Sequence, residues 1–259
     1  MKTLLASLLL TCIAMSPTLA QNTVDAKDIL AKINRKESVT YQNATITGDL
    51  DLTNLANRRE VKEGSWRGES REYLSTVEAP VSFKNCTFKG KFLAYRTDAS
   101  DERKLFSRSN TVYNADFNEA VTIENCTFDD DATFKYSHFR QRAIFTGNTF
   151  RETGLFKYAQ FANAADFSGS NFKGYADFKY TKFNESSAFQ KAEFGRYADF
   201  KYTKFDERVD FSQARFNGPA DFKYTHLPRG TRFDDARFSG STDFKYTTLD
   251  GRKFSPNAR

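Results

Sequence analysis

The sequence predicts an all-β solenoid, in which short strands stack in repeated coils around a narrow aromatic core. The tripeptide Phe-Lys-Tyr occurs six times, and each copy begins 22 residues after the one before it. Between these copies a large apolar residue returns at alternating steps of five and six residues. A short fixed period is typical of solenoids, because each unit can bury its apolar face only against its neighbours. The tripeptides begin at Phe134, Phe156, Phe178, Phe200, Phe222 and Phe244.

A small residue stands two positions before nearly every large apolar residue, as Ala198 stands before Phe200. In an extended chain, residues i and i−2 point to the same side, so each short segment turns one small and one large side chain inward. Four such segments make one coil of 22 residues. We therefore expect the six tripeptide phenylalanines to form a stacked structural core, with Phe178 between Phe156 and Phe200.

These units resemble the pentapeptide-repeat family. The segment Ala-Asp-Phe-Lys-Tyr-Thr-Lys-Phe at 176–183, found again at 198–205, is similar to the family pattern A-(D/N)-(L/F)-x-x. The resemblance covers residues 112–254 and, less regularly, 41–52 and 81–94. It implies a right-handed quadrilateral parallel β-helix, in keeping with the usual right-handed parallel crossover. This chain departs from the strict five-residue pattern by one additional residue at every second corner.

The chain begins with the features of a secretory signal peptide. A short basic start is followed by an apolar run that is too short to span a bilayer, and residues 18–20 are small enough for a cleavage site. We expect residues 1–20 to be removed and the protein to be exported, to the periplasm or the extracellular space. A lipoprotein acylated at Cys12 is the alternative, which the preceding Thr11 disfavours.

The rest of the chain divides into a capping helix, a solenoid and a tail. Residues 21–40 are expected to form the N-terminal capping helix, because their apolar residues have helical spacing and an uncovered β-helix end invites association. The β-helix is expected over 41–254, with insertions at 53–80 and 95–111 where the period is lost. Residues 255–259 form a C-terminal tail.

The charge of the chain is mildly basic. Loss of the signal peptide lowers the formal net charge from +6 to +5. We interpret this as a mixed charged surface that keeps a repeat protein soluble, with attraction to an anionic envelope polymer as the alternative. The sequence contains no basic block and no nucleic-acid motif, so no nucleic-acid partner is expected. No later segment approaches the ~20 apolar residues of a transmembrane helix.

Cys86 and Cys126 lie in the same tetrapeptide, Asn-Cys-Thr-Phe, and so take equivalent repeat positions. In adjacent coils their Cα atoms would lie about 4.8 Å apart, which a disulfide allows. Parallel Cβ vectors would keep the Cβ atoms about as far apart, beyond the usual ~3.5 to 4.5 Å. Buried free thiols are therefore the favoured interpretation, and a disulfide, which export would permit, is the alternative.

The sequence contains few candidates for catalytic or metal-binding residues. His138 and His226 share one repeat position, which Gln160, Lys182 and Lys204 fill in other coils, so we interpret both histidines as surface residues. No nucleophile elbow, phosphate loop, zinc spacing or dinucleotide fingerprint occurs. The sequence therefore predicts no catalytic residue, no metal site, no cofactor and no enzyme activity. An aspartate precedes the phenylalanine in most of the tripeptides, and a lysine follows it. We expect these residues to form two columns of opposite charge, each of which offsets the repulsion within the other.

Two surfaces are candidates for binding a partner. The outward tyrosines of the tripeptides either stack on one another along a corner or form an aromatic and basic strip for a partner. The insertion at 53–80 has a lone tryptophan among arginines, which either anchors an interface or packs the loop onto the coil. The candidate partner-binding residues are Arg58, Arg59, Trp66, Arg67, Tyr73, Tyr136, Tyr158, Tyr180, Tyr202, Tyr224 and Tyr246.

The favoured function is a non-enzymatic exported scaffold that binds a macromolecule of the cell envelope, either a protein or a glycan. A purely architectural protein that associates with itself is the alternative, and an envelope-modifying enzyme is disfavoured because no catalytic constellation is present. Some pentapeptide-repeat proteins are similar to DNA in shape and acidity and bind DNA gyrase, a role that the basic charge and the export signal oppose. We expect no cap at the C-terminal end, and therefore weak homodimerisation through the last coil.

Overall fold

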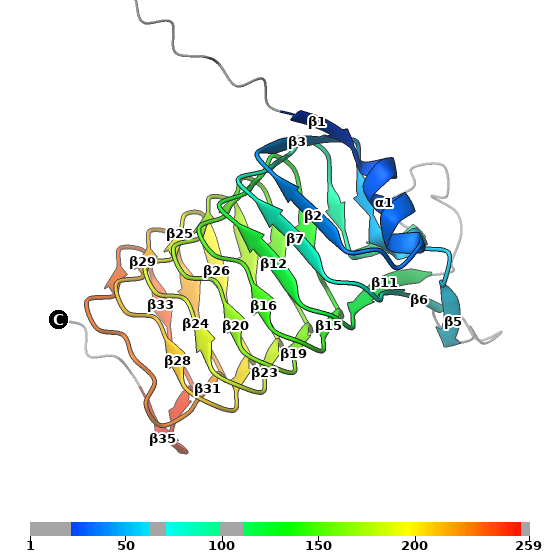
Figure 1. Ribbon diagram of the computed structural model, residues 1–259. Coiled ribbons are helices and arrows are strands. Elements are labelled where there is room, and N and C mark those ends of the chain that lie inside the picture. The colour runs from blue at the N-terminus through cyan, green and yellow to red at the C-terminus, as the bar shows by residue number, and fades with distance from the viewer. Residues whose placement is uncertain (1–21, 63–70, 99–110, 255–259) are drawn as a thin grey trace, which may run out of the picture.

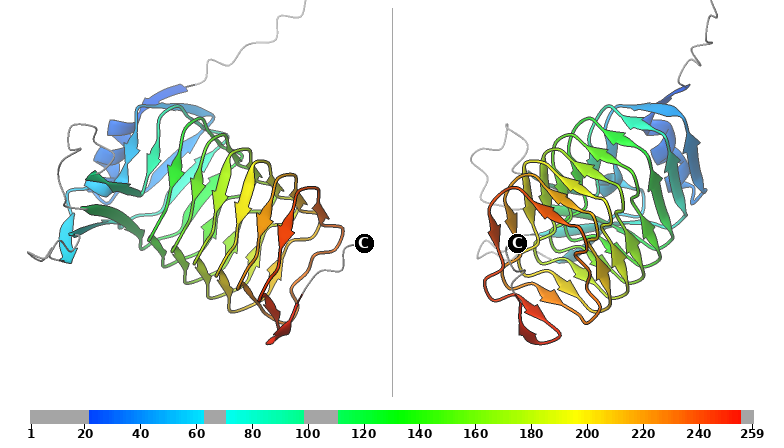
Figure 2. Two further views of the ribbon diagram at one scale, coloured as in Figure 1. Left: turned by 180° about the vertical axis from the view of Figure 1, so that it is seen from behind. Right: turned by 90° about the vertical axis from the view of Figure 1, so that its left-hand side faces the viewer.

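The computed structural model describes residues 22–62, 71–98 and 111–254 (Figure 1). Over these residues the chain winds through successive coils, whose strands pair into four sheets that form four sides of the molecule (Figure 2). Pairing is parallel apart from three antiparallel pairs in one sheet. The predicted quadrilateral parallel β-helix with a short N-terminal helix is confirmed. None of the helices in these ranges is long and apolar enough to cross a membrane.

Each complete coil passes through four sheets, called A to D, in the order B, A, C, D. Sheet D also contains three additional strands, which pair antiparallel to their neighbours. Sheet A contains β1 (Asn22–Asp25), β3 (Ala44–Thr47), β8 (Thr87–Phe88), β13 (Thr127–Phe128), β17 (Thr149–Phe150), β21 (Asn171–Phe172), β25 (Glu193–Phe194), β29 (Arg215–Phe216) and β32 (Arg237–Phe238). Sheet B contains β2 (Val39–Gln42), β7 (Val81–Lys84), β12 (Val121–Glu124), β16 (Ala143–Ile144), β20 (Ala165–Asp166), β24 (Ser187–Ala188) and β28 (Val209–Asp210).

The other two sides are sheets C and D, and a 3-10 turn, η1 (Leu52–Asn54), follows the first strand of sheet C. Sheet C contains β4 (Leu50–Asp51), β9 (Phe92–Leu93), β14 (Ala132–Thr133), β18 (Gly154–Leu155), β22 (Tyr175–Asp177), β26 (Tyr197–Asp199), β30 (Ala220–Asp221) and β33 (Thr242–Asp243). Sheet D contains β5 (Arg59–Lys62), β6 (Glu72–Val77), β10 (Tyr95–Thr97), β11 (Val112–Phe117), β15 (His138–Phe139), β19 (Gln160–Phe161), β23 (Lys182–Phe183), β27 (Lys204–Phe205), β31 (His226–Leu227), β34 (Thr248–Leu249) and β35 (Arg252–Lys253).

Each side of a coil is three residues long: a small inward residue, an outward residue and a large inward residue. Ala132, Thr133 and Phe134 form such a side, with Ala132 and Phe134 fully buried. The corners from sheet C to D and from B to A contain two residues, whereas the other two corners contain three, such as 140–142 and 151–153. The residue that exceeds the strict five-residue pattern therefore lies at the D-to-B and A-to-C corners.

Four columns of aromatic rings fill the interior. Within a column, the rings of successive coils are nearly parallel, with centroids between 4.6 Å (Phe139 and Phe161) and 5.3 Å (Phe172 and Phe194) apart. Rings of neighbouring columns meet edge to face, and such aromatic pairs add about 0.5 to 1.5 kcal/mol beyond their burial. The tripeptide column lies in this core: its first five rings are fully buried and Phe244 is 8% exposed.

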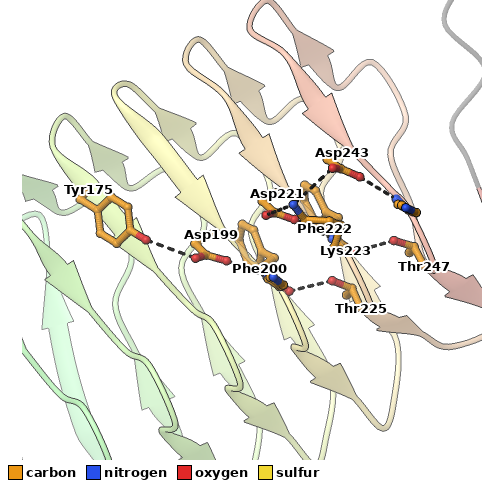
Figure 3. Close-up of polar contacts among 11 residues, drawn as sticks. Tyr175, Asp199, Phe200, Asp221, Phe222, Lys223, Thr225, Asp243 and Thr247 are labelled. Carbon is orange, nitrogen blue, oxygen red and sulfur yellow. Dashed lines mark hydrogen bonds and ion pairs between the residues drawn. The ribbon is translucent and has the colours of Figure 1, made fainter.

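Threonines in the small inward column satisfy backbone groups beside these rings. The Thr203 hydroxyl donates to the Phe178 carbonyl at 2.7 Å, and the Thr225 hydroxyl donates to the Phe200 carbonyl at the same distance (Figure 3). A buried carbonyl without such a partner would be destabilising. Threonine is thus accepted in a column that otherwise favours alanine because it is small and carries a donor.

The N-terminal end is covered by α1 (Ala26–Asn34), which lies across the first coil (Figure 1). Asp25 is the N-cap, and its carboxylate accepts a hydrogen bond from the Lys27 amide at 2.9 Å. Ala26, Ile29 and Ile33 turn toward the coil and are at most 3% exposed. The apolar face of the helix therefore closes the end of the core.

The predicted limits of the first insertion were wrong. Strand β6 pairs in parallel with β11 over its whole length, from Glu72 beside Val112 to Val77 beside Phe117, so part of 53–80 forms a coil side. In the rest of the described insertion, β5 runs antiparallel to β6. In the second insertion, β10 runs antiparallel to β11. The solenoid also begins earlier than expected, because β2 already pairs with β7.

The prediction of an uncapped C-terminal end was also wrong. Strand β35 folds back antiparallel to β34 through Asp250 and Gly251, both of which have a positive φ. The Phe254 ring then stacks on Phe233, with centroids 5.9 Å apart, and meets Phe244 edge to face. The end of the core is therefore partly covered by the chain itself. Weak homodimerisation through this coil stays a prediction, and the tail at 255–259 lies outside the described residues.

Cys86 and Cys126 are free and buried in adjacent coils. The Cys86 amide donates to the Cys126 Sγ atom at 3.3 Å. The structure thus agrees with the interpretation of two buried thiols rather than a disulfide.

Replacement of Phe200 by alanine should destabilise the protein by about 3 to 5 kcal/mol, because a fully buried ring is removed from a rigid column. Phe200 stacks on Phe178 at 5.1 Å and on Phe222 at 4.9 Å, so both neighbours lose contact. Denaturant unfolding of the mature protein measures the change. Gln160→Ala, at an exposed position of β19, is the control and should change stability by no more than about 0.5 kcal/mol. Equal stability of the two variants would refute the ring column.

Ala198→Leu should destabilise by about 1 to 3 kcal/mol, because Ala198 is 1% exposed and occupies the column that leaves room for the rings. The matched control is Ala188→Leu, since Ala188 is the outward residue of β24 and has space around it. Thermal unfolding of both variants compares the cost of a larger side chain at an inward position with its cost at an outward position. A neutral Ala198→Leu would mean that this position does not face the core.

Candidate functional site

The Phe-Lys-Tyr tripeptides turn the chain from sheet C to sheet D at one corner of each coil. In all six, the amide three residues after the phenylalanine donates to the phenylalanine carbonyl, at 2.9 to 3.2 Å. The tyrosine has a positive φ at every copy, for example 60° at Tyr180, as in a type II turn. The tyrosine side chains consequently follow one another along the outside of this corner.

The opposite corner, from sheet B to sheet A, uses the same two-residue turn without tyrosine. Its positive-φ position, with φ between 52° and 67°, is occupied by Asn43, Asn85, Asn125, Gly147, Gly169, Lys191, Gln213 and Asp235. Glycine adopts this conformation without strain, whereas other residues lose roughly 1 to 2 kcal/mol. The turn therefore does not select tyrosine, and the six tyrosines contribute through their side chains.

The tyrosine rings form a continuous stack. Centroids from Tyr136 to Tyr246 are 4.6 to 5.2 Å apart, and successive planes lie within 21° of parallel. Neighbouring rings cover each other's faces, so ring edges and hydroxyl groups meet the solvent. Tyr180 is 37% and Tyr246 54% exposed. Within the part of the chain that the structure describes, the hydroxyls of the last five tyrosines bond to no protein group, whereas the Tyr136 side chain interacts with Lys135.

Lysines lie beside the stacked rings. The ammonium of the tripeptide lysine lies over the ring of the next tyrosine, from 4.8 Å at Lys135 to 5.5 Å at Lys157. Such a contact contributes about 0.5 to 1 kcal/mol at an exposed site. Lys223 differs, because its Nζ atom lies 3.0 Å from Asp221 and 3.3 Å from Asp243 (Figure 3).

The aspartate column lies next to the lysines and stabilises the same turn. The Asp177 Oδ1 atom accepts a hydrogen bond from the Lys179 amide at 3.0 Å, and the three later aspartates accept the equivalent bond. Burial raises the pKa of Asp177 to about 6, and the nearby Asp199 carboxylate adds to this effect. Tyr175 donates its hydroxyl to Asp199 at 3.2 Å (Figure 3).

The corner is more cationic toward its N-terminal end. Thr133 and Leu155 occupy the positions that aspartates take in later coils. Lys135 and Lys157 therefore have no carboxylate in their own turns. Lys135 instead donates to the Tyr95 hydroxyl at 3.1 Å and lies 4.7 Å from the centre of that ring.

An arginine and tyrosine cluster continues the corner beyond the first tripeptide. Tyr73 of β6 stacks on Tyr113 of β11 at 5.3 Å. The Arg96 guanidinium lies 3.9 Å from the centre of the Tyr113 ring and 3.3 Å from the Asp51 carboxylate. Arg58 lies over both rings, 5.7 Å from Tyr73 and 5.6 Å from Tyr113.

Tyr95 and Arg96 connect this cluster to the stack. The pairing of β9 with β14 aligns Tyr95 with Lys135 and Arg96 with Tyr136. Tyr95 meets Tyr136 edge to face at 5.9 Å. We call this continuous surface the tyrosine strip, and it consists of Arg58, Tyr73, Tyr95, Arg96, Tyr113, Lys135, Tyr136, Lys157, Tyr158, Tyr180, Tyr202, Tyr224 and Tyr246.

The structure places two of the insertion candidates, Arg58 and Tyr73, on the tyrosine strip. Arg59 lies exposed in β5, and Trp66 and Arg67 lie outside the described residues. Sequence reasoning missed Tyr95, Arg96 and Tyr113, because they lie where the period breaks. The order of Tyr95-Arg96 after Ala94, which matches Lys-Tyr after phenylalanine with the two residue types exchanged, was the available signal.

The histidines belong to local contacts. His138 Nδ1 lies 3.1 Å from the Asp116 carboxylate, and His226 Nδ1 lies 3.0 Å from the Thr248 hydroxyl. No group of three or more His, Cys, Asp or Glu side chains in the described ranges could hold a metal ion.

Asp177→Asn should stabilise the protein at pH 7 by about 2 to 3 kcal/mol at most. Because the folded pKa is raised from 3.8 to about 6, the contribution of Asp177 is greatest below pH 3.8 and is lost as the pH rises through 6. Denaturant unfolding from pH 4 to 7 measures the difference from wild type. Asp243 has a pKa lowered by the Lys245 amide, so Asp243→Asn should instead destabilise at neutral pH. If Asp177→Asn did not increase the stability of the protein at pH 7, burial would not raise the pKa of Asp177 as described.

The repeats were compared with protein families, curated proteins and solved structures. A family model described as pentapeptide repeats (9 copies) matches residues 156–204 and 200–248. The crystal structure of HetL, a pentapeptide repeat protein involved in heterocyst differentiation regulation from the cyanobacterium Nostoc sp. strain PCC 7120, is 11% identical with a TM-score of 0.20, covering 89% of this chain and 90% of HetL. The comparison with curated proteins gave no match. The coils from 156 to 248 thus match the pentapeptide-repeat family model.

Proposed function

We propose that the protein is a non-enzymatic exported scaffold that binds a macromolecule of the cell envelope along the tyrosine strip. The observation that supports this proposal is a difference in residue type at the positive-φ position of two equivalent corners. Tyrosine takes the positive-φ position at all six tripeptide copies of the C-to-D corner, whereas eight residues of five types take it at the B-to-A corner. Export is supported by the signal-like sequence of residues 1–20.

The chemistry of the tyrosine strip favours one kind of partner. Because the ring faces are covered by stacking, the strip offers ring edges, hydroxyl donors and ammonium groups rather than open aromatic faces. A neutral glycan that stacks on aromatic faces has no face to bind. A protein surface rich in carboxylates and amide oxygens suits these donors, and Lys135 and Lys157, which have no carboxylate in their own turns, add positive charge at one end.

The double variant Tyr158→Gly, Tyr180→Gly should lose partner binding while it remains folded, since glycine suits a positive φ and the rings lie outside the core. Lys191→Gly, Gln213→Gly makes the same backbone change at the opposite corner and is the control. Quantitative capture from envelope extracts by both mature variants and wild type measures the effect. Capture of one acidic protein that falls with the tyrosine variant alone supports the proposal. Identical capture by all three proteins would sink it.

Charge should matter at one end of the strip only. Lys135→Gln, Lys157→Gln is expected to weaken binding of the captured partner by about tenfold, because two positive charges without a carboxylate in their own turns are lost. Lys223→Gln should have little effect, since Asp221 and Asp243 already neutralise this lysine. Titration of the purified partner at two salt concentrations provides the comparison. An equal loss in both variants would show that the N-terminal end has no special role.

A further inference from the structure

The outward face of sheet B is hollowed where two successive coils carry small side chains. The cleft has a volume of about 330 Å³, and Ala164, Ser186 and Ala188 line its middle. Small-molecule sites usually occupy about 300 to 1,000 Å³, so this cleft lies at the lower end of that range. It lies on a different side from the tyrosine strip and is independent of the proposed function.

Two arginines lie at the ends of the cleft. Arg142, Ala164, Ser186 and Arg208 take the same position in four successive coils, so the arginines flank two small residues. Within the described ranges neither arginine has an ion pair, whereas Arg232 lies 2.7 Å from Asp234. Unpaired guanidinium groups are the protein groups best suited to a carboxylate or phosphate.

A second column runs beside the arginines and carries two carboxylates. Asp166, Ala188, Asp210 and Arg232 succeed one another in register, and Arg232 lies 3.4 Å from the Asp210 carboxylate. Asp210 accepts hydrogen bonds from Gln190 at 2.6 Å and Ser212 at 2.8 Å, so its carboxylate is largely satisfied. In the same part of the chain, Asp166 accepts only the Ser168 amide, at 2.9 Å. One Asp166 oxygen therefore remains available at the centre of the face.

The two columns are separated by two residues along each strand, about 7 Å. A ligand that spans them meets positive charge on one side and negative charge on the other. A doubly anionic ligand would be repelled by Asp166, and a doubly cationic ligand by Arg142 and Arg208. The arrangement favours a ligand that carries both charges a few ångströms apart.

We propose that this cleft binds a small peptide-like zwitterion, with its carboxylate between Arg142 and Arg208 and its ammonium group at Asp166. A dipeptide has the right dimensions, because its two Cα atoms are about 3.8 Å apart and its charged termini extend beyond them. The small residues of the cleft leave room for its backbone, and the Ser186 hydroxyl, which donates to the Glu207 carboxylate at 3.2 Å, lies beside it. A free dipeptide carries both charges at this spacing, whereas the end of a longer peptide chain carries only one of them.

The test titrates the mature protein with alanyl-alanine, its N-acetyl derivative and its C-terminal amide, using amide chemical shifts as the readout. Alanyl-alanine should bind at least about tenfold more tightly than either blocked form, because each block removes one charge contact. Shifts should be confined to sheet B. No saturable binding, or equal binding of all three peptides, would overturn the proposal.

Variants separate the two contacts. Arg142→Gln, Arg208→Gln should abolish binding, and Asp166→Asn should make the free and N-acetyl peptides bind equally. Ala188→Tyr fills the cleft from an outward position and should also prevent binding. Arg237→Gln, at an exposed position of sheet A without an ion pair in the described ranges, is the matched control and should bind normally. Binding that survives both arginine substitutions in a folded protein would refute the site.

If the strand register of sheet B were lost in a variant, the chemical shifts would reveal it before any peptide is added. Tetra-alanine then tests the spacing of the two charges, because its ammonium group and its carboxylate lie farther apart than those of a dipeptide. Weaker binding of tetra-alanine than of alanyl-alanine supports simultaneous contacts with the arginines and with Asp166. Equal affinity for the two peptides would contradict these paired contacts.

Discussion

In-register stacking of coils about 4.8 Å apart is the constraint on which the rest of this structure depends. Each side chain meets its counterpart from the next coil at that distance, and offset parallel aromatic rings pack well there. Phe178 accordingly lies 5.0 Å from Phe156 and 5.1 Å from Phe200. The small residue two positions earlier leaves the space that each ring occupies. The alternation of small and large inward residues is therefore a consequence of the same stacking.

The same constraint governs the surface. Stacking brings like charges together, as at Asp177 and Asp199, whose pKa values burial and mutual repulsion raise. It also turns the corner tyrosines into a stack that exposes only edges and hydroxyls. On sheet B the like-charged columns are interrupted by small residues, and these interruptions create the cleft beside Asp166. The columns of charged residues and tyrosines, and the cleft between charged residues on sheet B, thus all result from the same 22-residue repeat.

The sequence was sufficient for the coil, the ring column and the capping helix, because each follows from a local period. It was insufficient where pairing depends on distant residues. Strand β6 lacks the phenylalanine pattern and joins the solenoid only because it pairs with β11. Phe254 reaches the core only because Asp250 and Gly251 reverse the chain. Arg96 joins the tyrosine strip through its contact with Tyr113, which no short-range pattern specifies.

The account is tested most directly by removing one whole coil. Deletion of residues 182–203 joins Thr181 to Lys204 and removes 22 residues, so every later side chain keeps its column. Deletion of 182–202 removes one residue fewer and shifts the join. Denaturant unfolding should show a cooperative transition for the first deletion, and a much weaker or absent one for the second. Equal stability of the two deletions, or loss of folding in the first, would contradict the claim that in-register stacking determines this fold.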